Sequence, residues 1–346
     1  MKLFVGLDVS LRKTALCVVD EAGQIIAEGT ALSEPPALIA KLAAWRDQIA
    51  LIGIEACPLS EWLFAGLSSA GFEVRCLETR HAQRFLSTRP NKTDRNDARG
   101  IASMMRLGHF KPVHVKSRPA QFLRALLVGR SQIMSAMLQI ENTIRGLLRV
   151  QGLKIGKVHR SRYGARVEDL CQSEPELLPA VMPLLEARQT MRDQLAKLDR
   201  SLVRATREDD VCRLLMTAPG VGPVTALAFK STIDDPARFK SSKAVAAHLG
   251  LTPKVYQSGE IDRSGHISKS GDKLMRHLLA EAATSLLLRT RKWCALKAWG
   301  VRLARKVGTG KAIVAVARKL AIILHTMWVT GEEFRFGAAD AAPKIP

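Results

Sequence analysis

The segment Leu3-Phe4-Val5-Gly6-Leu7-Asp8-Val9-Ser10 places an aspartate near the end of a run of apolar, strand-forming residues. A second run, Leu51-Ile52-Gly53-Ile54-Glu55, ends in a glutamate. A carboxylate in or just past a buried strand is costly unless its charge is offset, and a divalent cation held between several carboxylates does this. The two runs therefore predict strands whose ends carry metal ligands.

Two further carboxylates, Asp94 and Asp97, lie in the segment Asn91-Lys92-Thr93-Asp94-Arg95-Asn96-Asp97-Ala98-Arg99, near which a helix is expected to open. They are three residues apart, so on a helix they share one face. Mg²⁺ prefers oxygen ligands, and a pair of such ions can stabilise both the attacking and the leaving oxygen of a phosphoryl transfer. Taken singly, Asp94 is also explained as a helix cap and Asp97 as an ion-pair partner of Arg95 or Arg99. The set of four suggests phosphodiester chemistry.

Periodicity orders the elements around these carboxylates. Alternating or continuous apolar runs predict strands at 2–9, 14–19, 24–29, 49–55 and 72–77, and three- and four-residue spacing predicts helices at 37–48 and 59–70 and from about 91. The resulting β-β-β-α-β-α-β-α order is that of ribonuclease H-like domains, in which helices pack on both faces of a mixed sheet. We expect an α/β domain over residues 1–117.

The rest of the chain is expected to be helical. Residues 118–208 contain two long amphipathic segments, 119–152 and 176–207, which predict a helical hairpin or a coiled-coil seam between subunits. Residues 209–336 are expected to form a helical C-terminal domain, followed by a tail at 337–346. The segment Pro219-Gly220-Val221-Gly222-Pro223 has the form of a helix-hairpin-helix turn, in which Gly220 and Gly222 would expose backbone N–H groups to a phosphate. A purely structural turn would also use these glycines.

The charge is distributed unevenly. The 346 residues carry a net charge of +21, yet residues 1–90 hold 9 Lys and Arg against 10 Asp and Glu, so the excess lies in the remainder. Such an excess favours a nucleic-acid partner, since cations placed on phosphates release counterions. The six cysteines are scattered without metal-binding or disulfide spacing. No signal peptide is seen, and the apolar stretch 312–329 contains Arg318, Lys319 and His325, so we expect a cytoplasmic protein without a membrane span.

A second group of polar residues occupies 249–276. Small, flexible residues alternate there with cations, as expected for a loop pressed against a nucleic-acid backbone; the expected nucleic-acid-binding residues of the chain are Lys92, Arg95, Arg99, Gly220, Gly222, Lys254, Arg263, Lys269, Lys273 and Arg276. Ser258 offers a hydroxyl on this loop, but serine is a weak nucleophile without activation and no general base stands beside it in the sequence. From the residues alone, an ordinary polar turn is the better explanation.

Together, the segments 6–10, 92–98, 219–222 and 258–259 resemble the IS-one-ten family of insertion-sequence transposases, also called DEDD transposases, whose relatives include the Piv-type invertases. The resemblance covers nearly the whole chain. It implies a RuvC-like N-terminal domain with the metal-binding tetrad Asp8, Glu55, Asp94 and Asp97, binding Mg²⁺ or Mn²⁺. It also implies a C-terminal transposase domain in which Ser258 becomes covalently joined to DNA. The neighbour Gln257 departs from relatives that have a second serine there.

The resemblance further implies DNA and a structured, element-encoded guide RNA as partners, so that base pairing chooses the sequence. Strand exchange needs at least two active centres, so we expect a homo-oligomer, dimer or tetramer. Three alternatives remain: a RuvC-like junction resolvase, nuclease or invertase without an RNA guide; a non-catalytic nucleic-acid-binding protein; and an actin-like ATP-binding or sugar-kinase domain. The last normally has a Gly-rich phosphate loop after its aspartate, whereas Asp8 precedes Val9-Ser10-Leu11-Arg12-Lys13.

Overall fold

The computed structural model describes residues 1–87, 93–258 and 261–337. The chain divides into two compact units, residues 1–116 and 117–346. Each unit has its own hydrophobic core. The sequence predicts further divisions near 208 and 336, and these stay predictions.

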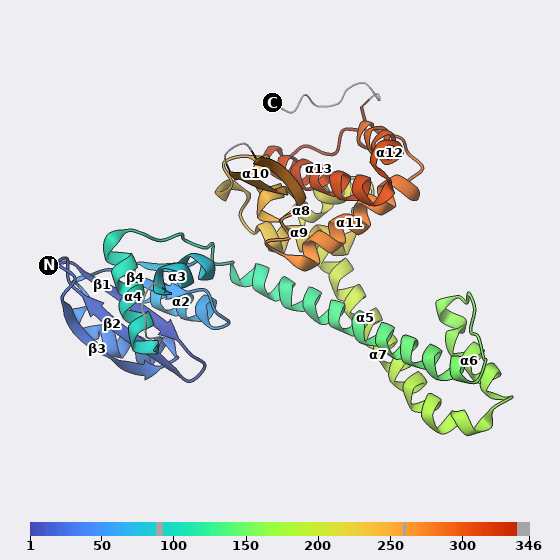
Figure 1. Ribbon diagram of the computed structural model, residues 1–346, viewed down its shortest axis with the longest axis horizontal. Coiled ribbons are helices and arrows are strands. Elements are labelled where there is room, and N and C mark those ends of the chain that lie inside the picture. Colours follow the sequence, from blue (N-terminus) through green and yellow to red (C-terminus); the bar gives the residue numbers. More distant parts are fainter. Residues whose placement is uncertain (88–92, 259–260, 338–346) are drawn as a thin grey trace. The chain divides into compact units, whose positions relative to one another are not determined.

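The first unit is built on a five-stranded mixed sheet in the order β3-β2-β1-β4-β5 (Figure 1). Antiparallel pairing joins β1 to β2 and β2 to β3, whereas β4 is parallel to β1 and β5 is parallel to β4. The mixed sheet expected from the sequence is therefore present. The strands are β1 (Leu3–Val9), β2 (Lys13–Val19), β3 (Ile25–Leu32), β4 (Ile49–Glu55) and β5 (Val74–Leu77).

Helices cover both faces of this sheet because its strands are apolar on both sides. On one face Leu3, Val5 and Leu7 are fully buried against leucines of α1 (Pro35–Leu42) and α2 (Ser60–Ser69). A short 3-10 helix, η1 (Ala43–Trp45), continues α1. On the other face lies α4 (Asp94–Leu107), with α3 (Thr79–Leu86) packed beside it.

Two glycines let α4 lie directly on the strands. A Cβ added to Gly6 of β1 would be 2.1 Å from the Ala98 carbonyl oxygen and 2.3 Å from the Ala102 nitrogen. A Cβ added to Gly53 of β4 would be 2.8 Å from the Met105 side chain. Since real Cβ atoms do not approach so closely, the absence of a side chain at Gly6 and at Gly53 lets α4 lie this close to the sheet.

The second unit begins with two long helices, α5 (Arg118–Val150) and α7 (Leu178–Arg207), where the periodicity predicts them. They run antiparallel, since Leu127 and Leu202 share one cluster while Ile144 and Val181 share another at the far end (Figure 1). The elements at that far end, which the sequence did not predict, are η2 (Arg160–Arg162), α6 (Tyr163–Cys171) and η3 (Pro175–Leu177).

The remaining helices of the second unit surround one large core. Leu127 of α5 and Leu202 of α7 belong to this core, so the long helices are anchored in it. Its elements are α8 (Asp210–Met216), α9 (Pro223–Ile233), η4 (Pro236–Arg238), α10 (Ser242–His248), α11 (Lys273–Leu288), α12 (Ala295–Val307) and α13 (Thr309–Thr330). Only α13, among the described residues, is long and apolar enough to cross a membrane, and its buried residues, including Val316, Leu320 and Leu324, line this core.

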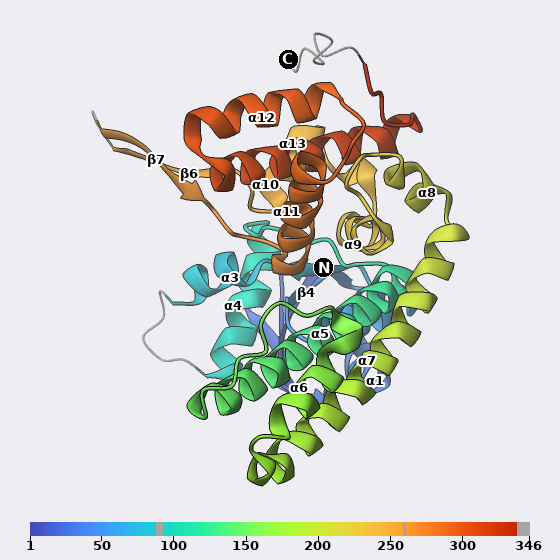
Figure 2. The ribbon, with the colours of Figure 1, turned by 90° about the vertical axis from the view of Figure 1, so that its right-hand side faces the viewer.

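A two-stranded antiparallel ribbon extends from these helices (Figure 2). Its strands are β6 (Pro253–Ser258) and β7 (Ile261–Ile267). The sequence predicted a flexible loop here, and that prediction is wrong. All six residues of β6 are exposed, so no alternation of apolar and polar positions marks the strand in the sequence.

Candidate active site

Asp8 and Glu55 are neighbours at the carboxyl ends of two parallel strands. The register pairs Gly6 with Gly53 and Leu7 with Ile54, so the next positions on β1 and β4 are Asp8 and Glu55. Side chains alternate along a strand, so each carboxylate lies on the same face as the glycine two residues before it. That is the face covered by α4, and both side chains are partly buried there.

Asp94 and Asp97 lie on the stripe of α4 that faces the sheet. They stand four residues before Ala98 and Ile101, which contact the sheet at Gly6 and Gly53, and residues four apart share a helix face. At the other end of α4, Arg106 donates to the carbonyl oxygen of Glu21 (3.3 Å), just after β2.

This contact fixes the direction of α4. Glu21 follows the end of β2, and the register pairs Val19 near that end with Phe4 at the start of β1. The C-terminal end of α4 therefore lies over the start of β1, and its N-terminal turn points toward Asp8. The fold directs four carboxylates to one end of the first unit, the carboxylate edge: Asp8, Glu55, Asp94 and Asp97.

The donor chemistry of the carboxylate edge suits a hard divalent cation, because all four groups supply carboxylate oxygens. Within residues 1–87, 93–258 and 261–337, however, no three His, Cys, Asp or Glu side chains are grouped closely enough to hold a metal ion. The main chain thus brings the tetrad to a common edge and face, while the side chains are not gathered into a ligand set.

Arg95 and Arg99, which the sequence assigned to nucleic-acid binding, contact a carboxylate of their own unit. Arg95 Nε donates to Glu28 Oε2 (2.7 Å), and Arg99 donates through Nη2 to the same oxygen (3.0 Å) and through Nε to Glu28 Oε1. Glu28 lies on β3 with only 11% of its side chain exposed. The hydrogen bonds from Arg99 and then Arg95 outweigh burial and lower the pKa of Glu28 to about 2. The two arginines therefore fasten the start of α4 to the sheet.

Ser258 is the last residue of β6 and is exposed. Its hydroxyl has no hydrogen-bond partner within the described part of the chain. On the same ribbon the side chains of Val255 and Tyr256 are 63% and 65% exposed, although both are large and apolar or aromatic. A serine near the end of such a ribbon is accessible to a macromolecular substrate.

The other expected nucleic-acid contacts differ in their surroundings. Lys254, Arg263, Lys269 and Lys273 are exposed on or beside the ribbon. Arg276 instead donates to the carbonyl oxygens of Leu249 (3.2 Å) and Ser270 (3.0 Å), so it ties the segments flanking the ribbon together. Lys92 lies outside the described residues.

The two glycines of the predicted helix-hairpin-helix turn, Gly220 and Gly222, also differ in their surroundings. Gly220 has a φ of +87°, and a Cβ there would be 2.3 Å from the Ala282 carbonyl oxygen of α11. Its lack of a side chain thus serves close packing inside the second unit. Gly222 precedes α9, and an added Cβ would meet nothing within 4 Å. Of the two, Gly222 has the open surroundings that a phosphate would need.

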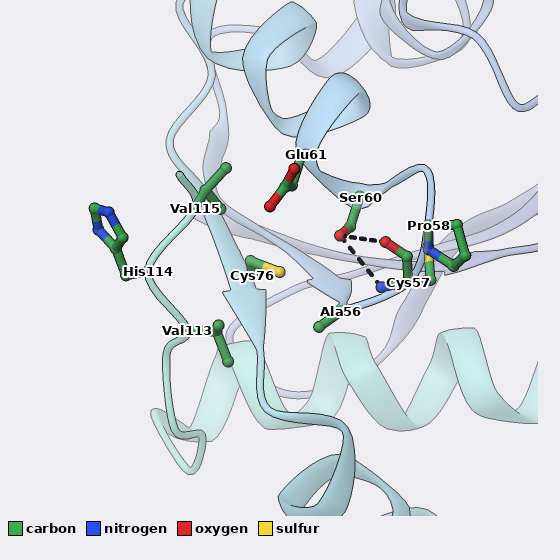
Figure 3. Close-up of a pocket in the computed structure, with 9 residues that line it drawn as sticks. All are labelled: Ala56, Cys57, Pro58, Ser60, Glu61, Cys76, Val113, His114 and Val115. Atoms are coloured by element: carbon green, nitrogen blue, oxygen red, sulfur yellow. Dashed lines mark hydrogen bonds between the residues drawn. The ribbon is translucent and has the colours of Figure 1, made fainter. Parts of the chain in front are cut away.

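A cavity of about 430 Å³ adjoins the carboxylate edge, and sequence reasoning did not find it (Figure 3). One wall is the segment 56–58 that directly follows Glu55, and the other is the segment 113–115 that pairs with the end of β5. Its lining includes the thiol of Cys76 and the carboxylate of Glu61. Its lining residues come from segments that are far apart in the sequence, and no local pattern marks them as neighbours.

Comparison with known proteins shows two transposase family models along the chain. A DEDD-type transposase family model matches residues 5–151, a range that contains the whole carboxylate edge. The family model described as Transposase IS116/IS110/IS902 family matches residues 212–298, a range that contains the ribbon.

Curated relatives match over most of their length. The transposase of insertion sequence element IS1111A from Coxiella burnetii is 26% identical over 96% of this chain and 92% of its own. A Sinorhizobium fredii protein named as a transposase is 31% identical over 84% of this chain and 76% of its own. A Pseudomonas aeruginosa protein named as a family 20 transposase is 29% identical over 80% of this chain and 83% of its own. The chain belongs to the IS110/IS116/IS902 family of insertion-sequence transposases, enzymes that cut and rejoin DNA.

Proposed function

We propose that this transposase cuts and rejoins DNA through a covalent bond between Ser258 and the DNA, assisted by Mg²⁺ or Mn²⁺ at the carboxylate edge. The proposal is supported by the register between β1 and β4 together with the packing of α4 on Gly6 and Gly53. These two features direct Asp8, Glu55, Asp94 and Asp97 to one edge. This arrangement fits the RuvC-like form of the ribonuclease H fold. A divalent ion held there would stabilise negative charge on the oxygens of the phosphate.

The serine step balances without an external energy source. The Ser258 hydroxyl loses its proton and its oxygen bonds to phosphorus, while the bond from phosphorus to a deoxyribose oxygen breaks and that oxygen takes a proton. A deoxyribose hydroxyl of the new strand then reverses the step and frees the serine. Each phosphodiester bond broken is replaced by another, so rejoining needs no ATP.

Trapping the intermediate tests this chemistry. Full-length protein, element RNA, element-end DNA and Mg²⁺ should yield an adduct that migrates as protein plus DNA on a denaturing gel. Ser258→Ala should abolish the adduct, whereas Gln257→Ala, which alters the exposed neighbour on the same strand, should retain it. Equal adduct from Ser258→Ala would exclude this residue as the nucleophile.

A hydrolytic nuclease or junction resolvase is the second candidate. It is favoured by one observation: within the described residues nothing is hydrogen-bonded to the Ser258 hydroxyl that could take its proton. If DNA cutting persists in Ser258→Ala but is lost in Asp97→Ala, water rather than the serine attacks the phosphate.

A guide RNA, a homo-oligomer and a cytoplasmic location complete the proposal. The net charge of +21 exceeds what a small DNA contact requires and suits a second polyanion. Between Leu127 and Ile144, α5 has no fully buried apolar side chain, and Leu138 is 55% exposed, which suits a helical surface covered by a second copy. RNase treatment should abolish cutting, and light scattering should give a dimer or tetramer; insensitivity to RNase would favour an invertase without an RNA guide.

A further inference from the structure

The cavity beside the carboxylate edge is a built recess rather than a gap between loops. Val113 N–H donates to the Cys76 carbonyl (2.8 Å), which fixes the wall formed by 113–115. On the opposite wall, Ser60 Oγ donates to the Cys57 carbonyl (2.8 Å) and accepts from the Cys57 N–H (3.2 Å). The Ala56 N–H donates to the Leu77 carbonyl oxygen, and the Ala56 carbonyl oxygen accepts from the Thr79 hydroxyl. These wall groups are therefore already hydrogen-bonded within the protein.

One side chain differs from the rest of the lining. Glu61, in the first turn of α2, has no hydrogen-bond or ion-pair partner within the described residues, and its carboxylate points into the cavity toward Cys76 (Figure 3). Burial raises the pKa of the Cys76 thiol, which is therefore a neutral, weakly polar surface. The remaining walls include Pro58, Val113 and Val115.

This lining selects a class of ligand. The lining contains no lysine or arginine, the ring of its one histidine, His114, points away from the other lining side chains (Figure 3), and Glu61 is its one carboxylate, so a phosphate would be repelled. Apolar walls and a single carboxylate acceptor suit a flat, neutral ring that carries N–H donors. A volume of about 430 Å³ lies within the range of small-ligand pockets and exceeds that of a single base.

The activity of the family supplies such rings. Strand exchange moves a strand from one duplex to another, so bases beside the cut are unpaired during the reaction, and enzymes commonly hold unpaired bases in recesses. The cavity wall begins at the residue after Glu55. Cys76 and Glu61 lie on the α2 face of the sheet, opposite the face that carries the Glu55 side chain, so a strand that crosses the end of the sheet at the carboxylate edge can place a neighbouring base in the cavity.

We propose that this cavity binds one unpaired base of the DNA strand held at the carboxylate edge, with guanine preferred, and that Glu61 accepts hydrogen bonds from its ring N–H and amino group. Guanine presents these two donors side by side, and a carboxylate accepts such a pair with both oxygens. Thymine has one ring donor flanked by two acceptors, which repel the second carboxylate oxygen. The proposal rests on the strand placement proposed above.

Cys57 provides a readout that is independent of cutting. It lines the cavity and is the only cysteine of the six that is not buried. A base in the cavity should shield its thiol from iodoacetamide, and peptide mass spectrometry resolves Cys57 from the five buried cysteines, which serve as internal references. The probes are short single-stranded oligothymidines with or without one central guanine, each at a concentration that saturates binding by fluorescence anisotropy.

We expect the guanine probe to slow Cys57 alkylation about tenfold relative to oligothymidine, the factor that a hydrogen bond to a charged group supports. Inosine, which lacks the amino group, should protect less than guanine. Glu61→Gln should remove the preference for guanine, whereas Glu34→Gln, at an exposed glutamate of the same unit outside the cavity, should keep it.

Two results would overturn the proposal: a Cys57 alkylation rate that no saturating probe alters, or equal protection by all probes that Glu61→Gln leaves unchanged. The test also separates this proposal from the proposed chemistry. Guanine-dependent protection in a protein that forms no serine adduct would support the base site while refuting the serine mechanism.

Discussion

Arg99 of α4 and Glu28 of β3 form a two-point ion pair, with Arg99 donating through Nε to one carboxylate oxygen and through Nη2 to the other at 3.0 Å. Arg95, one turn earlier, adds a contact of 2.7 Å to the same glutamate. Charge-assisted, forked hydrogen bonds of this kind are among the strongest that side chains make. The start of the helix that carries Asp94 and Asp97 is thus fastened to the edge strand of the sheet.

Replacing Glu28 should loosen this turn. Glu28→Gln removes the charge from both arginine contacts, so amide hydrogen exchange in the first turns of α4 should accelerate about tenfold. DNA cutting should then need more Mg²⁺ for half-maximal rate. Glu73→Gln is the control, because Glu73 pairs with Arg75 on the same segment of chain and its side chain is 56% exposed. Unchanged exchange in α4 would show that the ion pair does not hold the helix.

The same pair should make stability depend on acidity. The pKa of Glu28 falls from 4.5 to about 2 in the folded protein, so its contribution is fully present above pH 4.5 and is lost as the pH falls toward 2. The difference in urea midpoint between the unaltered protein and Glu28→Gln, followed by circular dichroism, should therefore shrink across that interval. A difference that grows on acidification would contradict the assignment.

Gly6→Ala should displace α4. The new methyl group would stand 2.1 Å from the Ala98 carbonyl oxygen, and the contact is with backbone that cannot rotate away. We expect a loss of about 3 kcal/mol or more in unfolding free energy, together with loss of DNA cutting. Gly146→Ala in α5, where an added Cβ meets nothing within 4 Å, should instead stabilise the protein by about 0.5–1 kcal/mol. Thermal or urea unfolding of both variants measures the contrast.

His325 should make the second unit sensitive to mild acid. Burial lowers its pKa below 6.5, although its contact with the Pro236 carbonyl oxygen (3.0 Å) partly opposes this. The unfolded chain then takes up the proton more readily, so stability is present above about pH 6.5 and falls as the pH drops below it. The melting temperature should decline less steeply for His325→Gln between about pH 7.5 and about pH 5. His277→Gln, at an exposed histidine, should retain the original slope.

Removing divalent metal should stop cutting without unfolding the chain. EDTA should abolish cutting, and Mg²⁺ or Mn²⁺ should restore it. Asp97→Ala should lower the rate by about a hundredfold or more at any metal concentration, because a ligand is lost. The circular dichroism spectrum should remain the same throughout. Full activity in EDTA would refute a metal-assisted reaction.

Short-range patterns predicted most of the elements that carry the carboxylate edge. The two runs ending at Asp8 and Glu55 are strands, and they pair in parallel within the mixed sheet that the order of elements predicts. The spacing of Asp94 and Asp97 placed both on one helix stripe. These features depend on residues close together in the chain, so periodicity suffices to find them.

Features that depend on distant contacts were not predictable. The pairing of Arg95 and Arg99 with Glu28 joins segments about seventy residues apart, and nothing in either segment signals it. Gly220 looked like a phosphate-binding residue because the sequence does not show that α11 packs against it. The sequence did not predict α3, which buries only Ala82, or α6, which buries Tyr163, Val167 and Cys171 but spans only nine residues.

The length of the ribbon formed by β6 and β7 sets how far Ser258 lies from the helices at the base of the ribbon. Because no core residue fixes β6, whose six residues are all exposed, the distance of the serine from its helical base grows by roughly 3.3 Å for each added residue pair across the two strands. Inserting one residue in each strand turns the Ser258 hydroxyl to the opposite face of the ribbon. Inserting two residues in each strand returns the hydroxyl to its original face and moves it outward. Under the proposed chemistry, a longer ribbon would bring the Ser258 hydroxyl to a more distant phosphate, while the helices at its base stay unchanged.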